Sequence, residues 1–265
     1  MQFFDTHSHI GLIYNDPIEQ IRVIQQAKQA DVTRIISINN NLLDFKKEYA
    51  FLKSITGIYH AVGVSPSEVK APGIDWQNTI VESAKLPNVV AIGEMGLDYD
   101  KKYGDKRSQI ELFIQELEIA KSCNLPAIIH NRMAGDDIFE ILKERIPAQG
   151  AIFHCYSEDS NYAHKCLDAG LNVYFSFAGN LTYRNAKNLH GTALNLPLDR
   201  ILVESESPFL PPQEFIKKDS TKKTRTKPYM LPATARFLSE LLGMDLETVS
   251  AQLWKNSCKI FNLPE

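Results

Sequence analysis

The stretch that decides the fold is Phe3-Phe4-Asp5-Thr6-His7-Ser8-His9, a short apolar run that leads directly into Asp-Thr-His-Ser-His. Residues two apart on a strand point to the same side, so His7 and His9 are expected to face together. Two imidazoles at that spacing can chelate one metal ion. An H-x-H pattern also occurs by chance among surface histidines, but its place at the end of a first apolar strand favours the metal-binding interpretation.

Short β-rich runs continue along the chain, and helical patterns separate them. Several runs are continuously apolar, which is typical of parallel strands covered on both faces. The eight predicted strands are Phe3 to His7, Arg34 to Ile38, Tyr59 to Val64, Val89 to Gly93, Ala127 to His130, Ala151 to His154, Asn172 to Phe177 and Ile201 to Glu204. This alternation predicts a closed (β/α)8 TIM barrel of the α/β class, with residues 1–265 as one domain. A doubly wound open sheet is the alternative, but no G-x-G-x-x-G motif follows the first strand.

Two of the helical patterns are especially clear. After the start signal Asp16-Pro17, apolar residues recur at helical spacing. They are Ile18, Ile21, Ile24 and Ala27. The clearest stripe consists of Ile110, Phe113, Ile114, Leu117 and Ala120. Such stripes are typical of helices that pack against a core.

The composition excludes several classes of protein. The 265 residues are 44% hydrophobic, which is enough for a sizeable core, and 29 basic against 32 acidic residues give no global basic field. A local basic patch or a metal pair can still hold a phosphate. The four cysteines form no C-x-x-C pair and are expected to be reduced thiols. Without a signal-peptide pattern or a long apolar span, the sequence predicts a cytoplasmic protein with no membrane association and no evident obligate protein partner.

Histidines and carboxylates gather at the ends of the predicted strands. Four of the seven histidines are placed there, namely His7, His9, His130 and His154. One such histidine is more often a hydrogen-bonded core residue, but four at equivalent strand ends indicate a shared site. Glu94 follows the fourth strand, and Glu204 and Glu206 follow the last one. A carboxylate buried there needs a compensating cation; pairing with Arg132 or a loop lysine is the alternative.

These histidines and carboxylates suit a site for two divalent metal ions. Such a site can generate a hydroxide at neutral pH and stabilise charge on a phosphoryl or carbonyl oxygen. Zn, Mn and Mg are all arguable, and the many imidazoles favour Zn or Mn over Mg.

A polar segment from Pro211 to Pro228 interrupts the alternation and carries a cluster of basic residues. In a barrel it would be a loop on the active-site face, because it follows the eighth strand. Lys222, Lys223 and Arg225, together with Arg132, are candidate contacts for a substrate phosphate. A solvated surface loop is the alternative interpretation.

The sequence resembles the TatD family of metal-dependent deoxyribonucleases, within the amidohydrolase-like barrels. The matching motifs run in order along nearly the whole chain: DTHSH at Asp5 to His9, GEMGLDY at Gly93 to Tyr99, QIELFIQELEIAKSCNLPAIIHNRMA at Gln109 to Ala134, FHCYS at Phe153 to Ser157, YFSFAGN at Tyr174 to Asn180, VESESPFLPP at Val203 to Pro212 and NSCKIFNL at Asn256 to Leu263.

The resemblance implies a role for each matching residue. It implies His7, His9, Glu94, His130 and His154 as metal ligands, with Glu94 bridging two ions. It also implies hydrolysis of DNA phosphodiester bonds by attack of metal-bound water.

Some positions depart from the family pattern. Glu206 replaces an aspartate ligand and is expected to serve as a terminal ligand and possible general base. Ser65 stands where many members have a histidine, and Gly11 replaces an acidic residue.

Two other functions remain open on the same barrel. One is a metal-dependent hydrolase of a small amide, lactone or phosphoester, since a fold does not fix a substrate. The other is a non-catalytic binding protein whose metal site has decayed. A site open to a nucleic-acid strand favours the nuclease, and a deep closed pocket favours the small substrate.

Overall fold

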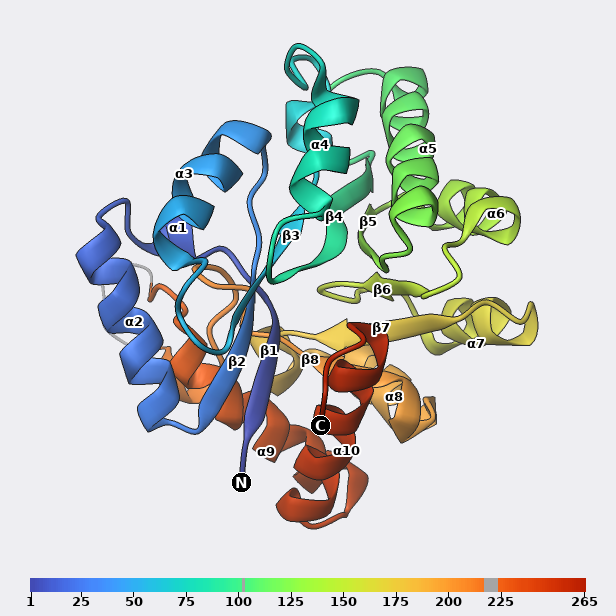
Figure 1. Ribbon diagram of the computed structural model, residues 1–265. Helices are drawn as coiled ribbons and strands as arrows, with labels where there is room; N and C mark the ends of the chain where they lie inside the picture. Colours follow the sequence, from blue (N-terminus) through green and yellow to red (C-terminus); the bar gives the residue numbers. More distant parts are fainter. Residues whose placement is uncertain (102, 217–223) are drawn as a thin grey trace.

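Eight parallel strands, each paired with the next in chain order, surround the centre of the molecule in the computed structural model, which describes residues 1–101, 103–216 and 224–265. Helices lie around the outside of this sheet (Figure 1). The strands are β1 Phe3–Ser8, β2 Val32–Ser37, β3 Ile58–Val62, β4 Val89–Asp98, β5 Ala127–Arg132, β6 Ala151–Phe153, β7 Val173–Phe177 and β8 Ile201–Val203. The predicted (β/α)8 barrel is confirmed.

The sheet closes where β1 meets the chain that follows β8. Ser8 and Ser207 form a parallel bridge, and the amide of His9 donates to the carbonyl of Ser207 at 2.9 Å. One residue earlier, the amide of Glu206 donates to the carbonyl of His7 at 3.0 Å. These bonds fix the backbone of Glu206 against that of His7.

Several helices begin at side-chain caps that the sequence supplies. Asp16 accepts from the amide of Ile18 at 2.8 Å before Pro17, and Asn41 accepts from the amide of Asp44 at 2.9 Å. The α-helices are α1 Ile10–Ile13, α2 Pro17–Gln29, α3 Leu42–Leu52, α4 Trp76–Ala84, α5 Lys106–Cys123, α6 Gly135–Arg145, α7 Ser160–Asp168, α8 Lys187–Asn195, α9 Leu231–Leu242 and α10 Leu246–Ile260. Short 3-10 turns include η1 Pro66–Glu68 after β3 and η4 Gln213–Phe215 after β8.

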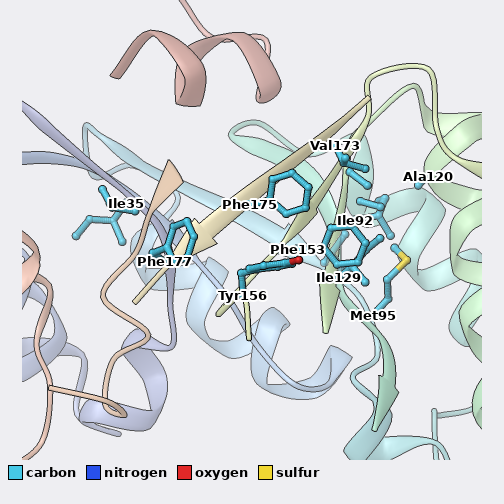
Figure 2. Close-up of a cluster of buried hydrophobic side chains, with 14 of the residues drawn as sticks. Ile35, Ile92, Met95, Ala120, Ile129, Phe153, Tyr156, Val173, Phe175 and Phe177 are labelled. Atoms are coloured by element: carbon cyan, nitrogen blue, oxygen red, sulfur yellow. The ribbon is translucent and has the colours of Figure 1, made fainter. Parts of the chain in front are cut away.

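The core has an outer and an inner layer because successive residues of a strand face opposite sides. Ile35 and Ile129 belong to the outer layer, between strands and helices, whereas Ile36 and Ile128 fill the barrel interior. Figure 2 shows part of the outer layer, where the rings of Phe153 and Phe175 stack with centroids 5.8 Å apart. Helix α10 adds Cys258 and Ile260 to the inner cluster. The barrel interior is therefore packed.

Three details of the sequence prediction were wrong, one in a strand and two in helices. Strand β4 does not end at Gly93 but runs to Asp98, so Glu94 lies within it. In α2, Ile18 and Ile21 are exposed, and the buried face is made by Gln20, Val23, Ile24 and Ala27. The buried set follows the i, i+3, i+4, i+7 spacing of one helix face. The predicted residues are spaced by three throughout, so they do not stay on that face. In α5 likewise, Ile110 and Ile114 are only partly buried.

No helix in the described parts of the chain is both long and apolar enough to cross a membrane. The thiols of all four cysteines are free, in agreement with the absence of a C-x-x-C pair.

Candidate metal centre

The structure brings the six predicted ligands together at the C-terminal ends of the strands. They come from five parts of the chain, and each lies within 4 Å of another member of the set. His7 lies in β1 and His9 follows it, Glu94 lies in β4, His130 lies in β5, His154 follows β6, and Glu206 follows β8. The β-strand period places His7 and His9 on one side, with their Nε2 atoms 3.2 Å apart.

Glu94 lies between two pairs of histidines. Its Oε2 is 3.8 Å from Nε2 of His7 and 3.6 Å from Nε2 of His9. Its Oε1 is 2.9 Å from Nδ1 of His130 and 3.1 Å from Nε2 of His154. One carboxylate therefore presents one oxygen to each pair, which is the arrangement expected of a ligand that bridges two cations.

The polar atoms of this cluster fit a divalent cation. His7, His9, Glu94 and His154 are all buried, and their nitrogen and oxygen lone pairs converge. Ligand atoms of His7, His9 and Glu94 lie within 4.8 Å of one another, as do those of Glu94, His130 and His154. Glu206 Oε2 is buried without a hydrogen-bond partner. Buried, unsatisfied lone pairs are costly, and an ion with nitrogen and oxygen ligands would satisfy them.

The carboxylates of the cluster keep their charge although they are buried. Burial alone would raise the pKa of Glu94, but the charges and hydrogen bonds of His154 and His130 hold it well below the usual value. Burial likewise opposes ionisation of Glu206, but His7 and His154 lower its pKa to about 2. Both side chains are therefore anionic at neutral pH, as metal ligands must be.

Asp98 supports His130, a role that was not predicted from the sequence. Its Oδ2 lies 3.1 Å from Nε2 of His130, on the opposite side of that ring from Glu94. A carboxylate in this place fixes the ring orientation and leaves Nδ1 facing Glu94. Glu94 and Asp98 lie four residues apart on one strand and therefore on one face, but the continuation of β4 beyond Gly93 has no local signature in the sequence.

Glu204 lies behind His154 and is fully buried. Its Oε1 accepts a hydrogen bond from the amide of Cys155 at 2.7 Å and lies 3.6 Å from Nδ1 of His154. Burial, together with the nearby charge of Glu206, raises the pKa of Glu204 to about 7. Glu204 is thus placed to orient His154, whereas Glu206 Oε2 lies 3.5 Å from Nε2 of His7.

The structure describes two of the four residues predicted to contact a substrate phosphate, Arg132 and Arg225. Arg132 ends β5, two residues after His130, and its Nε lies 3.7 Å from Oδ2 of Asp100. Glu94 contacts histidines instead of Arg132, so the alternative pairing with that arginine is wrong. Arg225 donates to the carbonyl of Leu12 beside α1. Lys222 and Lys223 lie outside the described residues.

The structure shows the contacts of two positions that depart from the family pattern, Ser65 and Gly11. Ser65 is buried and its Oγ lies 2.6 Å from Oγ of Ser67. At Gly11 a Cβ atom would lie only 2.6 Å from Oε2 of Glu48, so a side chain at position 11 would have to displace that carboxylate. Glu48 reaches this place from α3.

Comparison with known proteins agrees with this geometry. The family model described as TatD related DNase matches residues 4–262. An uncharacterised metal-dependent hydrolase of Bacillus subtilis, YabD, is 34% identical over 98% of this chain and 99% of its own. A protein of Erwinia billingiae named 3'-5' ssDNA/RNA exonuclease TatD is 27% identical over 92% of this chain and 93% of its own.

A solved structure shows the same fold. The TatD homologue YJJV from Escherichia coli K12 superposes with a TM-score of 0.89 and covers 99% of this chain and 98% of its own, at 24% identity. Since the family model spans almost the entire chain, this protein belongs to the TatD family of metal-dependent hydrolases.

Proposed function

We propose that this protein is a deoxyribonuclease that uses two divalent metal ions to hydrolyse phosphodiester bonds in DNA. The observation that carries the proposal is the position of Glu94, which directs one oxygen toward His7 and His9 and the other toward His130 and His154. Two ions held by a shared carboxylate suit the hydrolysis of phosphodiesters, in which both the attacking and the leaving oxygen carry charge.

Each side chain has an assigned task in this proposal. His7 and His9 would hold one ion together with Glu94, and His130 and His154 would hold the other with the same carboxylate. When bound, the ions would lower the pKa of water and stabilise negative charge on a phosphoryl oxygen. Glu206 is a terminal ligand, and its unpartnered Oε2 is placed to accept a proton. The imidazole-rich set favours Zn or Mn over Mg.

The choice of DNA as substrate has two supports. The Erwinia billingiae relative is named as an exonuclease of single-stranded DNA and RNA. In this chain, Arg132 ends the strand that carries His130, and Arg225 lies beside α1, which follows His9. In this proposal both guanidinium groups contact phosphates next to the scissile bond.

The test is DNA cleavage by purified protein with Mg, Mn or Zn, measured together with metal content. His130→Ala should lose cleavage and metal, because it removes one ligand and leaves His154 as the only histidine beside Oε1 of Glu94 among the described contacts. His164→Ala is a matched control, since His164 lies in α7 and contacts the carbonyl of Asn195. Full metal occupancy without cleavage of any DNA would refute the nuclease assignment, and so would a His130→Ala variant as active as the parent protein.

A further inference from the structure

A groove of about 590 Å³ opens at the segment that follows the predicted ligand His9. Its walls come from α1, α2 and α3, which lie next to one another in Figure 1, and from the segment after β2. The groove is lined from Gly11 onward, two residues after the predicted ligand His9 in the chain, and none of the six predicted metal ligands lines it. This volume falls within the usual range of small-molecule sites.

The groove is unusually rich in amide side chains. Five of its lining residues are asparagine or glutamine: Asn15, Gln20, Asn39, Asn40 and Asn41. Amides carry both donors and acceptors, and they recognise the edges of nucleobases through paired hydrogen bonds. Phe51, which is 53% exposed, adds a flat apolar surface at the same groove. Aromatic rings of this kind stack on bases.

Two acceptor oxygens of this groove are buried and lack a side-chain donor. Glu48 is only 4% exposed; its Oε1 accepts from Ser37 and, at 3.2 Å, from Nδ2 of Asn39, whereas its Oε2 has no side-chain donor and lies against the backbone of Gly11. Gln20 is 5% exposed, and its Nε2 donates to the carbonyl of Tyr14 at 2.8 Å while its Oε1 remains unpartnered. Buried acceptors without a donor are rare in native proteins, so both oxygens point to a ligand that brings donors.

The charge of the groove excludes a phosphate as that ligand. Asp44, Glu48 and Glu68 provide three carboxyl groups against the single cation Lys47, which lies 3.6 Å from Asp44. A phosphate would be repelled here. The ligand group must be uncharged or cationic, flat enough to pack on Phe51, and able to donate hydrogen bonds.

We infer that this groove is a subsite for a nucleobase with an exocyclic amino group, such as adenine. The amino group donates to Oε2 of Glu48, and Gln20 offers a second acceptor. The inference rests on the proposed function, because it places a base of the nucleic acid next to the phosphodiester at the metal cluster. Gly11 has a direct part in it, since any side chain there would meet Glu48 Oε2.

The hydrogen bonds of Glu48 allow one substitution, Glu48→Gln, to test the subsite directly. Ser37 and Asn39 both donate to Oε1, so in Glu48→Gln the amide oxygen will take that position. The amide nitrogen then replaces Oε2 and turns that acceptor into a donor. The variant should therefore lose its preference for an amino group and favour a carbonyl, as in thymine.

The experiment measures the binding of 2'-deoxyadenosine and thymidine to the parent protein by NMR, at pH 8, above the pKa of about 7 that burial gives Glu48. The side-chain amide signals of Asn39 and Asn40 report on the groove. Deoxyadenosine should bind about tenfold more tightly than thymidine, the discrimination expected of one well-placed base contact. Glu48→Gln should abolish or reverse that ratio. Glu82→Gln, an exposed change on α4, should leave the ratio unaltered.

Gly11→Ala provides a second, independent variant. Its Cβ would displace the Glu48 carboxylate, so it should weaken deoxyadenosine binding even if Glu48→Gln folds poorly. Equal binding of the two nucleosides by the parent protein, or a ratio unchanged in Glu48→Gln, would overturn the subsite. Nucleoside binding is independent of cleavage. Selective binding without DNA hydrolysis would contradict only the proposed nuclease, and hydrolysis without selective binding would contradict only the subsite.

Discussion

Asp98 and Glu94 contact the two ring nitrogens of His130. Oδ2 of Asp98 lies 3.1 Å from Nε2, and Oε1 of Glu94 lies 2.9 Å from Nδ1. The two carboxylates therefore clamp one imidazole on opposite sides. Asp98 also accepts from the amide of Lys101 at 2.8 Å, which fixes its own position. This pairing makes His130 a preoriented ligand, although it is more exposed than the other histidines of the cluster.

The first prediction follows from that contact. Asp98→Asn should lower metal affinity about 10- to 100-fold, the effect usual for the loss of a carboxylate behind a ligating histidine. The substitution keeps the shape of the side chain, so thermal unfolding of the barrel should change little. Metal titration followed by calorimetry measures the affinity. An Asp98→Asn variant with unchanged affinity would show that His130 does not depend on this clamp.

A second prediction concerns Glu94. Glu94→Gln keeps one oxygen but loses the negative charge, so it cannot bind a cation at each of the two histidine pairs. We expect metal content to fall at both positions, whereas loss of His130 should empty mainly one. Elemental analysis of purified variants measures the number of ions per chain. Glu94→Gln with the full complement of the parent would contradict the bridging role.

The third prediction tests Glu206 as a working ligand. Its backbone is tied to His7 and its Oε2 lies 3.5 Å from Nε2 of that residue. Glu206→Ala should reduce both metal content and DNA cleavage. Glu206→Asp keeps the charge but withdraws the oxygens by about one bond length, roughly 1.5 Å, so it should retain more of both properties than the alanine variant. Parent-like values in Glu206→Ala would make this residue a bystander.

The fourth prediction concerns pH and His60, a histidine of β3 outside the metal cluster. Its ring is fully buried against Tyr49 and Phe45, and burial lowers its pKa to about 4 from an ordinary value of 6.5. The unfolded chain therefore takes up a proton below pH 6.5 while the folded protein does not. Stability should fall as the pH drops from about 6.5 toward 4, by about 2 kcal/mol at pH 5.

Comparison with His60→Phe isolates this contribution. The variant has no titrating group at this position. Its free energy of unfolding minus that of the parent protein should therefore increase as the pH is lowered from 8 to 5. Any constant cost of repacking cancels in that comparison. Denaturant unfolding at the two pH values measures the difference, and parallel behaviour of the two proteins would refute the assignment.

The fifth prediction concerns the basic segment after β8. Replacing Lys222, Lys223 and Arg225 by glutamine should weaken DNA binding and reduce the slope of log affinity against log salt by about two to three, because fewer counterions are released. Lys28, Lys255 and Lys259, on α2 and α10, provide a control of equal charge. An unchanged slope in the first triple variant would support the alternative of a solvated loop.

The sequence by itself determined the barrel and most of the metal cluster. Apolar strand runs alternate with helical patterns, and parallel strands bring their C-terminal ends to one side, so histidines at strand ends had to converge. These are properties of local periodicity and of chain order, and they can be read without coordinates. The same reasoning placed Glu94 and Glu206 beside the histidines, because each follows or lies within a strand.

Only the tertiary structure decided which side chains support that cluster. Asp98 meets His130 because β4 continues beyond Gly93 and pairs with β5, and neither fact has a local signature. Glu48 reaches Gly11 across the packing of α3 against the first βα connection. The exposed face of α2 was likewise set by its neighbours. Such contacts depend on distances between segments far apart in sequence, which are fixed only when the helices pack on the closed barrel.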